Sequence, residues 1–265
     1  MNTPYFYHPN WPVLYEDNHL LALYKPAGLL VQGDHTGAAS LLDLAKAWLK
    51  ERYQKKGEAF LGLVHRLDRP VAGVVLFCRT SKAAGRISEQ FRSGKVRKYY
   101  LAIVAGTPAA SSGQLIDHLE RHENRSSRIT PAPTSTSQEA RLSYRVLGSI
   151  TTSSLVEIHL ETGRHHQIRV QLSHLGHPIL GDLRYGAPAP LVQKQVALVA
   201  SKLTFFHPIT KDELSISSPL PRDWPWPPDR PVSQGPPWDW RELHALVCPT
   251  HGLSNYCSFC EIVKN

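Results

Sequence analysis

The sequence predicts an α+β fold built around a mixed sheet. Short apolar runs typical of strands alternate with amphipathic stretches typical of helices, without the strict strand–helix–strand rhythm of an all-parallel sheet. The chain has 265 residues, of which 42% are hydrophobic and 20% charged. That length and balance are typical of a globular protein with a substantial core, and they exclude a disordered chain.

The first predicted elements are a hairpin and a helix. In residues 13–24, apolar residues flank the turn-forming triplet Glu-Asp-Asn, which predicts two paired strands. Residues 40–53 should form a helix, because Ser40 can cap it and Asp43 follows three residues later. Apolar residues recur at helical spacing through the same stretch.

The later elements follow from the same patterns. They are strands at 60–64 and 74–77, a helix at 81–91, strands at 98–105, 139–147 and 154–161, a helix at 165–175 and a strand at 196–206. Residues 106–137 are rich in Ser, Thr, Pro and Gly, so we expect a long loop there. Residues 219–237 hold eight of the 21 prolines, which predicts an extended tail held by its tryptophans; a proline-motif ligand is the alternative.

The charge balance favours a polyanionic partner. Lys and Arg outnumber Asp and Glu by 30 to 22, a net charge of +8, although a merely solubilising surface charge is the alternative. No apolar run approaches the ~18 residues of a membrane helix, and the N-terminus lacks a secretion pattern, so we expect no membrane association. The four cysteines form no disulfide framework, which fits a cytoplasmic location.

Two segments about a hundred residues apart carry the chemistry. The first is His65-Arg66-Leu67-Asp68, between two predicted buried strands, and the second is the seven-residue segment Gly-Arg-His-His-Gln-Ile-Arg that ends at Arg169. Arg66 and Arg69 flank Asp68, and nearby cations keep a carboxylate ionised, as a nucleophile or base requires. A cap or a surface charge is the structural alternative for Asp68.

Four blocks of this sequence resemble the RluA-type pseudouridine synthases. The blocks are residues 15–17 with 25–29, residues 65–68 with Gly73, residues 96–102, and residues 162–169 with 176–182. The resemblance covers about residues 13–208. It implies a mixed, mostly antiparallel central sheet with flanking helices and an active-site cleft across it. It also implies isomerisation of a specific uridine in rRNA or tRNA to pseudouridine.

The resemblance assigns roles to three residues. Asp68 would be the catalytic carboxylate acting on a flipped-out uridine, whose N1–C1′ bond breaks before the uracil turns and rejoins through C5. Three roles are compatible with the sequence for Asp68: attack at C1′, attack at C6 or removal of a ribose proton. Tyr100 would stack on the base and assist proton removal, and Arg169 would pair with Asp68. No cofactor is implied for catalysis.

RNA contacts are expected from the basic residues near these blocks. The expected RNA-binding residues are Arg66, Arg69, Lys95, Arg97, Lys98, Arg164 and His165. Arg66 would fill the space of the flipped base or hold a phosphate. Three arginines of the predicted loop, Arg121, Arg125 and Arg128, would contact the RNA from the other side. No S4-like module precedes Val13, so we expect the RNA affinity to come from the catalytic domain and its additions. We also expect the protein to be a monomer.

The chain departs from the family pattern at two places and carries one addition. Val71-Ala72 replaces Thr-Ser, and Val199 replaces the histidine of a Leu-His-Ala triplet. The addition is a C-x2-H-x5-C-x2-C array whose spacing predicts a structural zinc site, with free thiols as the alternative. Its ligands would be Cys248, His251, Cys257 and Cys260. The predicted division is a catalytic domain at 1–215, a Pro/Trp-rich linker or tail at 216–240 and a small zinc element at 241–265.

Two other functions compete with the synthase. The first is a non-catalytic RNA-binding relative, against which the retention of Asp68, Tyr100 and Arg169 argues. The second is a metal-dependent hydrolase, whose ligands would be His165, His166, His174 and His177. Only Glu161 and Asp182 could support those histidines as carboxylates.

Overall fold

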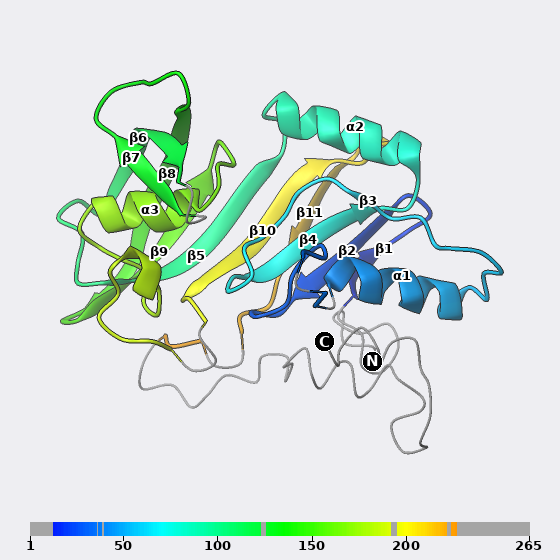
Figure 1. Ribbon diagram of the computed structural model, residues 1–265, viewed down its shortest axis with the longest axis horizontal. Coiled ribbons are helices and arrows are strands. Elements are labelled where there is room, and N and C mark those ends of the chain that lie inside the picture. The colour runs from blue at the N-terminus through cyan, green and yellow to red at the C-terminus, as the bar shows by residue number, and fades with distance from the viewer. Residues whose placement is uncertain are drawn as a thin grey trace, which may run out of the picture.

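The computed structural model of the protein describes residues 13–221 and 224–226, apart from 36, 39, 123–125 and 192–194. Within them, strands pair into one sheet in the order β1-β2-β4-β10-β5-β9-β8-β6-β7, with β11 beside β10 and β3 beside β4. The pair β4–β10 is parallel and the other pairs are antiparallel. The predicted α+β class with a mixed, mostly antiparallel sheet is confirmed (Figure 1).

The elements have the following bounds. The strands are β1 (Val13–Glu16), β2 (Leu20–Lys25), β3 (Gly62–Leu63), β4 (Ala72–Cys78), β5 (Arg97–Ala105), β6 (Ser112–Arg121), β7 (Ser127–Thr130), β8 (Gln138–Ile150), β9 (Ser153–Leu160), β10 (Leu198–Phe206) and β11 (Glu213–Ser217). The helices are α1 (Leu41–Arg52), α2 (Ser81–Arg92), α3 (Gln167–His174) and a 3-10 turn, η1 (Leu183–Tyr185).

The helices begin where local chemistry predicts. The Ser40 hydroxyl accepts from the Asp43 N–H at 3.3 Å at the start of α1, and Thr80 accepts from the Ala83 N–H at 3.2 Å at the start of α2. The apolar face of α1 is buried, as its spacing predicts. In Figure 1, α1 lies near β1 and β2, whereas α3 lies at the other end of the sheet beside β6 and β7.

The prediction of a long loop at 106–137 is wrong. Residues 112–121 form β6, which pairs with β8, and residues 127–130 form β7, the edge strand beyond it. Both strands are rich in polar residues because only part of one face is covered, by contacts with α3. Their alternation of half-buried and exposed side chains is too weak to distinguish them from a loop by composition.

Three smaller differences concern the ends of elements. The predicted strand at 60–64 is reduced to β3, and Phe60 is half exposed. The predicted helix at 165–175 begins only at Gln167, because His166 has a left-handed backbone with φ 55°. Strand β11 had no counterpart in the prediction. Beyond it, Trp224 is buried against the core, whereas most of the predicted tail at 216–240 lies outside the described residues.

The two departures from the family pattern lie side by side. Val199 of β10 pairs with Ala72 of β4 across the parallel ladder, and both are buried together with Val71. Apolar side chains therefore stand at facing positions, which avoids burying a polar group without a partner. In the described part of the chain, no helix has the length and apolar character required to cross a membrane.

Candidate active site

Asp68 lies in the loop between β3 and β4, and a turn after β2 holds that loop in place. The Gly28 N–H donates to the Arg69 carbonyl at 2.7 Å, and Arg69 Nε donates back to the Gly28 carbonyl at 2.9 Å. Gly28 has φ 89°, which favours glycine at this turn. The Val71 N–H donates to the Asp68 carbonyl at 3.0 Å, so the loop turns directly into β4.

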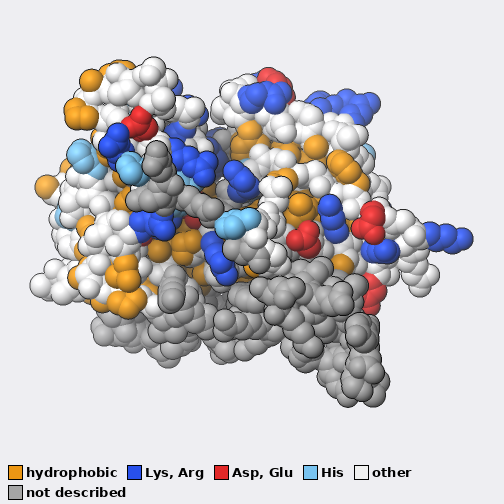
Figure 2. Space-filling model, in the orientation of Figure 1, with side chains coloured by type: hydrophobic (Ala, Val, Ile, Leu, Met, Phe, Trp, Pro, Cys, Tyr) orange, Lys and Arg blue, Asp and Glu red, His pale blue; other side chains and the backbone are white. Residues whose placement is uncertain are grey.

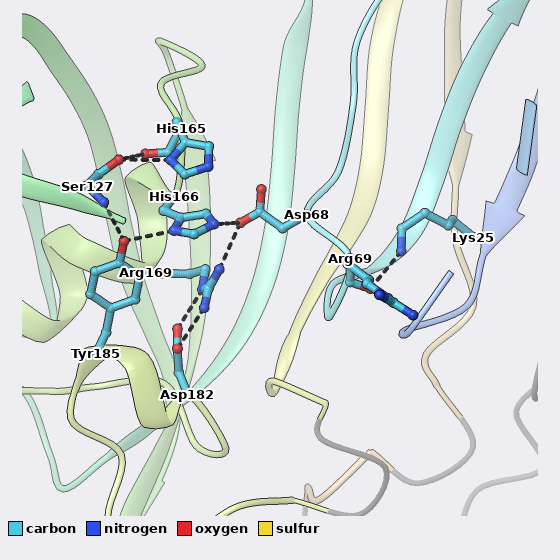
Figure 3. Close-up of polar contacts among 9 residues, drawn as sticks. All are labelled: Lys25, Asp68, Arg69, Ser127, His165, His166, Arg169, Asp182 and Tyr185. Atoms are coloured by element: carbon cyan, nitrogen blue, oxygen red, sulfur yellow. Dashed lines mark hydrogen bonds and ion pairs between the residues drawn. The ribbon is translucent and has the colours of Figure 1, made fainter. Parts of the chain in front are cut away.

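Lys25 reinforces this attachment from inside the protein. Its ammonium group is fully buried and donates to the carbonyls of Pro26 at 3.0 Å, Leu29 at 2.7 Å and Arg69 at 3.1 Å. Burial lowers the pKa of Lys25 to about 7, although the charge of Asp68 opposes the shift. Lys25 thus connects the end of β2 to the loop that presents Asp68 (Figure 3).

Arg169, on α3, joins Asp68 to a second carboxylate. Its Nη1 donates to Asp68 Oδ2 at 3.2 Å, whereas Nε and Nη2 donate to the two oxygens of Asp182 at 2.7 and 2.8 Å. The Asp68 side chain is 27% exposed, against 6% for Arg169 and 1% for Asp182. Burial alone would lower the pKa of Arg169, but its bonds to Asp182 and the nearby Asp68 raise it. The predicted pairing of Asp68 with Arg169 is therefore present, with Asp182 as an additional partner.

A second set of contacts, through His166, Tyr185 and Ser127, also leads to Asp68. His166 Nε2 lies 3.5 Å from Asp68 Oδ2, and its Nδ1 lies 2.8 Å from the hydroxyl of Tyr185. The Ser127 N–H, from β7, donates to that same hydroxyl at 2.8 Å. Burial, and then the charge of Arg169, lower the pKa of His166 to about 2, so its imidazole is neutral at physiological pH.

Tyr100 is buried in β5. Burial, followed by the nearby charge of Asp68, raises the pKa of its hydroxyl above the ordinary value, so the phenol keeps its proton. The three predicted catalytic residues thus share one neighbourhood: Arg169 donates directly to Asp68, and Tyr100 lies within reach of the Asp68 charge.

The predicted RNA-binding residues fall into two groups by exposure. The exposed ones are Arg66, Arg69, Lys95, Arg97 and Arg164, and the partly buried ones are Lys98 and His165. Figure 2 shows Lys and Arg side chains gathered on this face between the part with β6, β7 and α3 and the part with α2. This is the distribution expected of a surface that binds a polyanion.

Several of these cations also have partners within the protein. Arg97 pairs with Glu213 of β11 at 2.6 Å, and Arg164 Nε donates to the Glu139 carbonyl at 2.9 Å. Lys98 Nζ donates to a backbone carbonyl at 2.9 Å, and burial, with Arg164 nearby, lowers its pKa to about 8. Arg121 and Arg128 are exposed on β6 and β7, whereas Arg125 lies outside the described residues.

Sequence reasoning missed several residues that contact the site. Lys25 and Asp182 stand inside the blocks that resemble the family, so their positions were detectable but their partners were not. Tyr185 follows the last block. Ser127 had no signal, because the strand that carries it was predicted as loop.

The structure gives no support to a metal centre built from the histidines. Among the described residues, no three His, Cys, Asp or Glu side chains gather as metal ligands would. His177 Nδ1 instead lies 2.8 Å from the Ala105 carbonyl, and His174 is exposed at the end of α3. The four residues of the predicted zinc array lie outside the described part of the chain, so zinc binding there stays a prediction.

Comparison with known sequences places the chain in a family. The sequence profile described as RNA pseudouridylate synthase matches residues 19–174. The chain is 35% identical over 214 residues to "Uncharacterized RNA pseudouridine synthase YhcT" of Bacillus subtilis, covering 80% of this chain and 69% of that protein. It is also 35% identical over 225 residues to "Ribosomal large subunit pseudouridine synthase D" of Xylella fastidiosa, covering 80% of this chain and 66% of that protein.

A shorter relative and a solved structure agree with this result. The "tRNA pseudouridine synthase C" of Haemophilus ducreyi is 35% identical over 235 residues, covering 80% of this chain and 92% of that protein. The structure of human RNA Pseudouridylate Synthase Domain Containing 4 is similar with a TM-score of 0.67 and 29% identity, covering 80% of this chain and 89% of that one. The matched profile includes Asp68 and Arg169 and the elements that carry them. The chain therefore belongs to the RluA-type family of RNA pseudouridine synthases.

Proposed function

We propose that this protein isomerises a specific uridine in rRNA or tRNA to pseudouridine, with Asp68 as the catalytic carboxylate. The observation that carries the proposal is the hydrogen bond from Arg169 Nη1 to Asp68. The Nε and Nη2 atoms of the same guanidinium are held by Asp182. A guanidinium held beside a carboxylate fixes its orientation and complements its negative charge.

Tyr100 is proposed to lie against the flipped base. A phenol that stays protonated next to a carboxylate presents both an aromatic surface and a hydroxyl that can exchange a proton with the substrate. No cofactor takes part, because the uracil released from C1′ is itself the group that rejoins through C5.

The basic face is proposed to bind the RNA backbone around the target. Arg66, on the exposed side of the Asp68 loop, would replace the flipped base or hold its phosphate. Flipping costs a few kcal/mol, and it costs least for a base that is not in a duplex, so we expect a uridine in a loop. The names of the relatives point to large-subunit rRNA and tRNA as the two candidate substrates.

The test is to map pseudouridine by carbodiimide in tRNA and rRNA made without modifications. The wild-type protein should create a new site, and Asp68→Asn should lower its rate by at least about 10³-fold while the circular dichroism spectrum stays unchanged. Asp212→Asn, at an exposed aspartate, serves as the matched control and should keep full activity. Equal activity of Asp68→Asn and wild type would contradict the role of Asp68.

The same experiment separates the synthase from the non-catalytic relative. If wild type and Asp68→Asn both bind RNA but neither changes a uridine, the RNA-binding alternative gains support. RNA from cells that lack the protein then provides the decisive comparison, since a synthase would leave one uridine unmodified there.

A further inference from the structure

Two side-chain nitrogens approach the same oxygen of Asp68, one as a hydrogen-bond donor and one at a longer distance. In the described part of the chain, Arg169 Nη1 lies 3.2 Å from Oδ2 and His166 Nε2 lies 3.5 Å from it (Figure 3). Oδ1 is then the oxygen available to a substrate. The chemical state of His166 matters, because only a nitrogen that carries a proton attracts a carboxylate; a bare lone pair would repel it.

Hydrogen bonding on the other side of the ring determines that state. Tyr185 has one hydroxyl proton, and its oxygen already accepts the Ser127 N–H at 2.8 Å. Among the described residues, the acceptor within reach of that proton is His166 Nδ1, 2.8 Å away, which assigns the hydroxyl as donor and Nδ1 as acceptor. In a neutral imidazole the proton must then be on Nε2, the nitrogen that faces Asp68.

The surroundings keep the ring neutral as well as oriented. The charged and titratable groups that face His166 are Asp68, Arg169, His165, Arg184, Arg121 and Tyr185. Four of these, Arg169, His165, Arg184 and Arg121, act with burial to lower the pKa of His166. The neutral ring is thereby favoured at neutral pH, and with Nδ1 as the acceptor its proton is on Nε2.

The position of His166 is held by several independent contacts. Its backbone has φ 55°, a left-handed conformation that residues other than glycine adopt uncommonly. Its ring stacks on His165 with 3.8 Å between centroids. Ser127 Oγ donates to the His165 carbonyl at 2.6 Å, so the buried Ser127 holds both His165 and Tyr185. A side chain held this way has little freedom to leave Asp68.

We propose that His166 is a positioning residue for pseudouridine formation, whose Nε2–H holds Oδ2 of Asp68 so that Oδ1 faces the uridine. Tyr185 fixes the tautomer and the Ser127 N–H fixes the Tyr185 hydroxyl. The inference rests on the proposed function, and it extends the site to a strand at the edge of the sheet. A misplacement of Asp68 by about 1 Å would cost up to about 100-fold in rate.

The kinetic test uses two amide replacements of His166. In His166→Gln the amide nitrogen reaches the place of Nε2 and can donate to Asp68, whereas in His166→Asn the shorter side chain cannot. Asparagine also tolerates the left-handed backbone, so loss of activity in that variant is not caused by strain. We expect the single-turnover rate to fall about 10- to 100-fold in His166→Asn and about 5-fold or less in His166→Gln, with RNA dissociation constants unchanged within about 2-fold.

The spectroscopic test reads the tautomer directly in protein labelled with ¹⁵N-histidine. The His166 signal, assigned by its loss in His166→Gln, should show a neutral ring protonated at Nε2 at pH 7. In Tyr185→Phe, which removes only the hydroxyl, a fraction protonated at Nδ1 should appear and the single-turnover rate should fall. An Nδ1–H ring or an imidazolium in wild type would overturn the proposal.

These outcomes distinguish a failure of the positioning role from a failure of the proposed function. If wild type makes pseudouridine and His166→Asn reacts as fast, the positioning role fails while the proposed function stands. If His166→Gln is as impaired as His166→Asn while its unfolding free energy stays at the wild-type value, donation from Nε2 does not position Asp68 and the positioning role also fails. If wild type makes no pseudouridine in any RNA tested, the proposed function itself fails.

Discussion

Lys25 is an unusual residue, because a fully buried ammonium group is rare unless it is paired. Here its partners are three backbone carbonyls, which accept hydrogen bonds but carry no net charge. Burying an ammonium group without a charged partner costs folding free energy, but its three hydrogen bonds fix the positions of the carbonyls that accept them. It holds the turn after β2 at a fixed place relative to the carbonyl of Arg69, next to Asp68.

Replacing Lys25 by Met should therefore affect both stability and activity. The change keeps the volume of the side chain but leaves three carbonyls without their donor, which should lower the free energy of unfolding by about 2–4 kcal/mol. Urea unfolding measures this loss, and single-turnover kinetics should show a slower reaction in the folded protein. Lys50→Met, at an exposed pair with Glu58, is the control and should change stability by less than about 1 kcal/mol. Equal losses in the two variants would refute a special role for Lys25.

At the scale of elements, the start of β4 determines how closely the Asp68 loop approaches β10. Gly73 pairs with Lys25 on one side and with Ala200 on the other, at φ 127°. A Cβ placed there would lie 2.4 Å from the Ala200 carbonyl oxygen and 2.5 Å from its nitrogen. Backbone atoms cannot give way as a flexible side chain can, so only glycine allows β4 and β10 to meet here.

Gly73→Ala should consequently destabilise the protein by about 3 kcal/mol or more, or prevent folding. Gly85→Ala makes the same chemical change in α2, where a Cβ meets nothing within 4 Å. That control should raise stability by about 0.5–1 kcal/mol, because glycine is a poor helix former. Thermal unfolding of the two variants against wild type checks both signs. A Gly73→Ala protein as stable as wild type would mean that β10 does not approach β4 as described.

At the scale of the whole molecule, His65 couples stability to pH. Its Nε2 accepts the Leu76 N–H of β4 at 2.9 Å, and its ring stacks on Phe91 of α2. Burial, and then the charge of Lys98, lower the pKa of His65 from 6.5 to about 4. Between pH 6.5 and about 4, His65 is protonated in the unfolded chain but neutral in the folded protein. The contribution of His65 to the free energy of unfolding is therefore full above pH 6.5 and is lost as the pH falls towards 4.

The expected loss from His65 between pH 7 and 4 is on the order of 2–3 kcal/mol. His65→Gln can still accept the Leu76 N–H but cannot titrate, so its unfolding free energy should depend less steeply on pH over this range. His174→Gln, at an exposed histidine, should keep the slope of wild type. Urea unfolding at half-unit pH steps provides the measurement. Parallel curves for wild type and His65→Gln would exclude this contribution.

The sequence pattern predicted the α+β class, both long helices, the first hairpin and most strands of the core, and the family resemblance predicted the pair Asp68–Arg169. These features depend on local spacing and on ordered blocks of residues, which can be detected in the amino-acid sequence without a structure. The prediction was wrong for β6 and β7, because strands at this end of the sheet bury little and their polar composition is typical of loops. It also placed His166 inside a helix, although that residue stands just before α3.

Tertiary structure alone decided the surroundings of Asp68. The carboxylate partner of Arg169, the hydroxyl that orients His166 and the backbone N–H that orients that hydroxyl come from segments far apart along the chain. Which atoms of such segments meet depends on how β7, α3 and η1 pack, and no local pattern encodes that packing. The family resemblance could name the acid and its arginine, but only the packed sheet determines which oxygen of Asp68 the arginine holds.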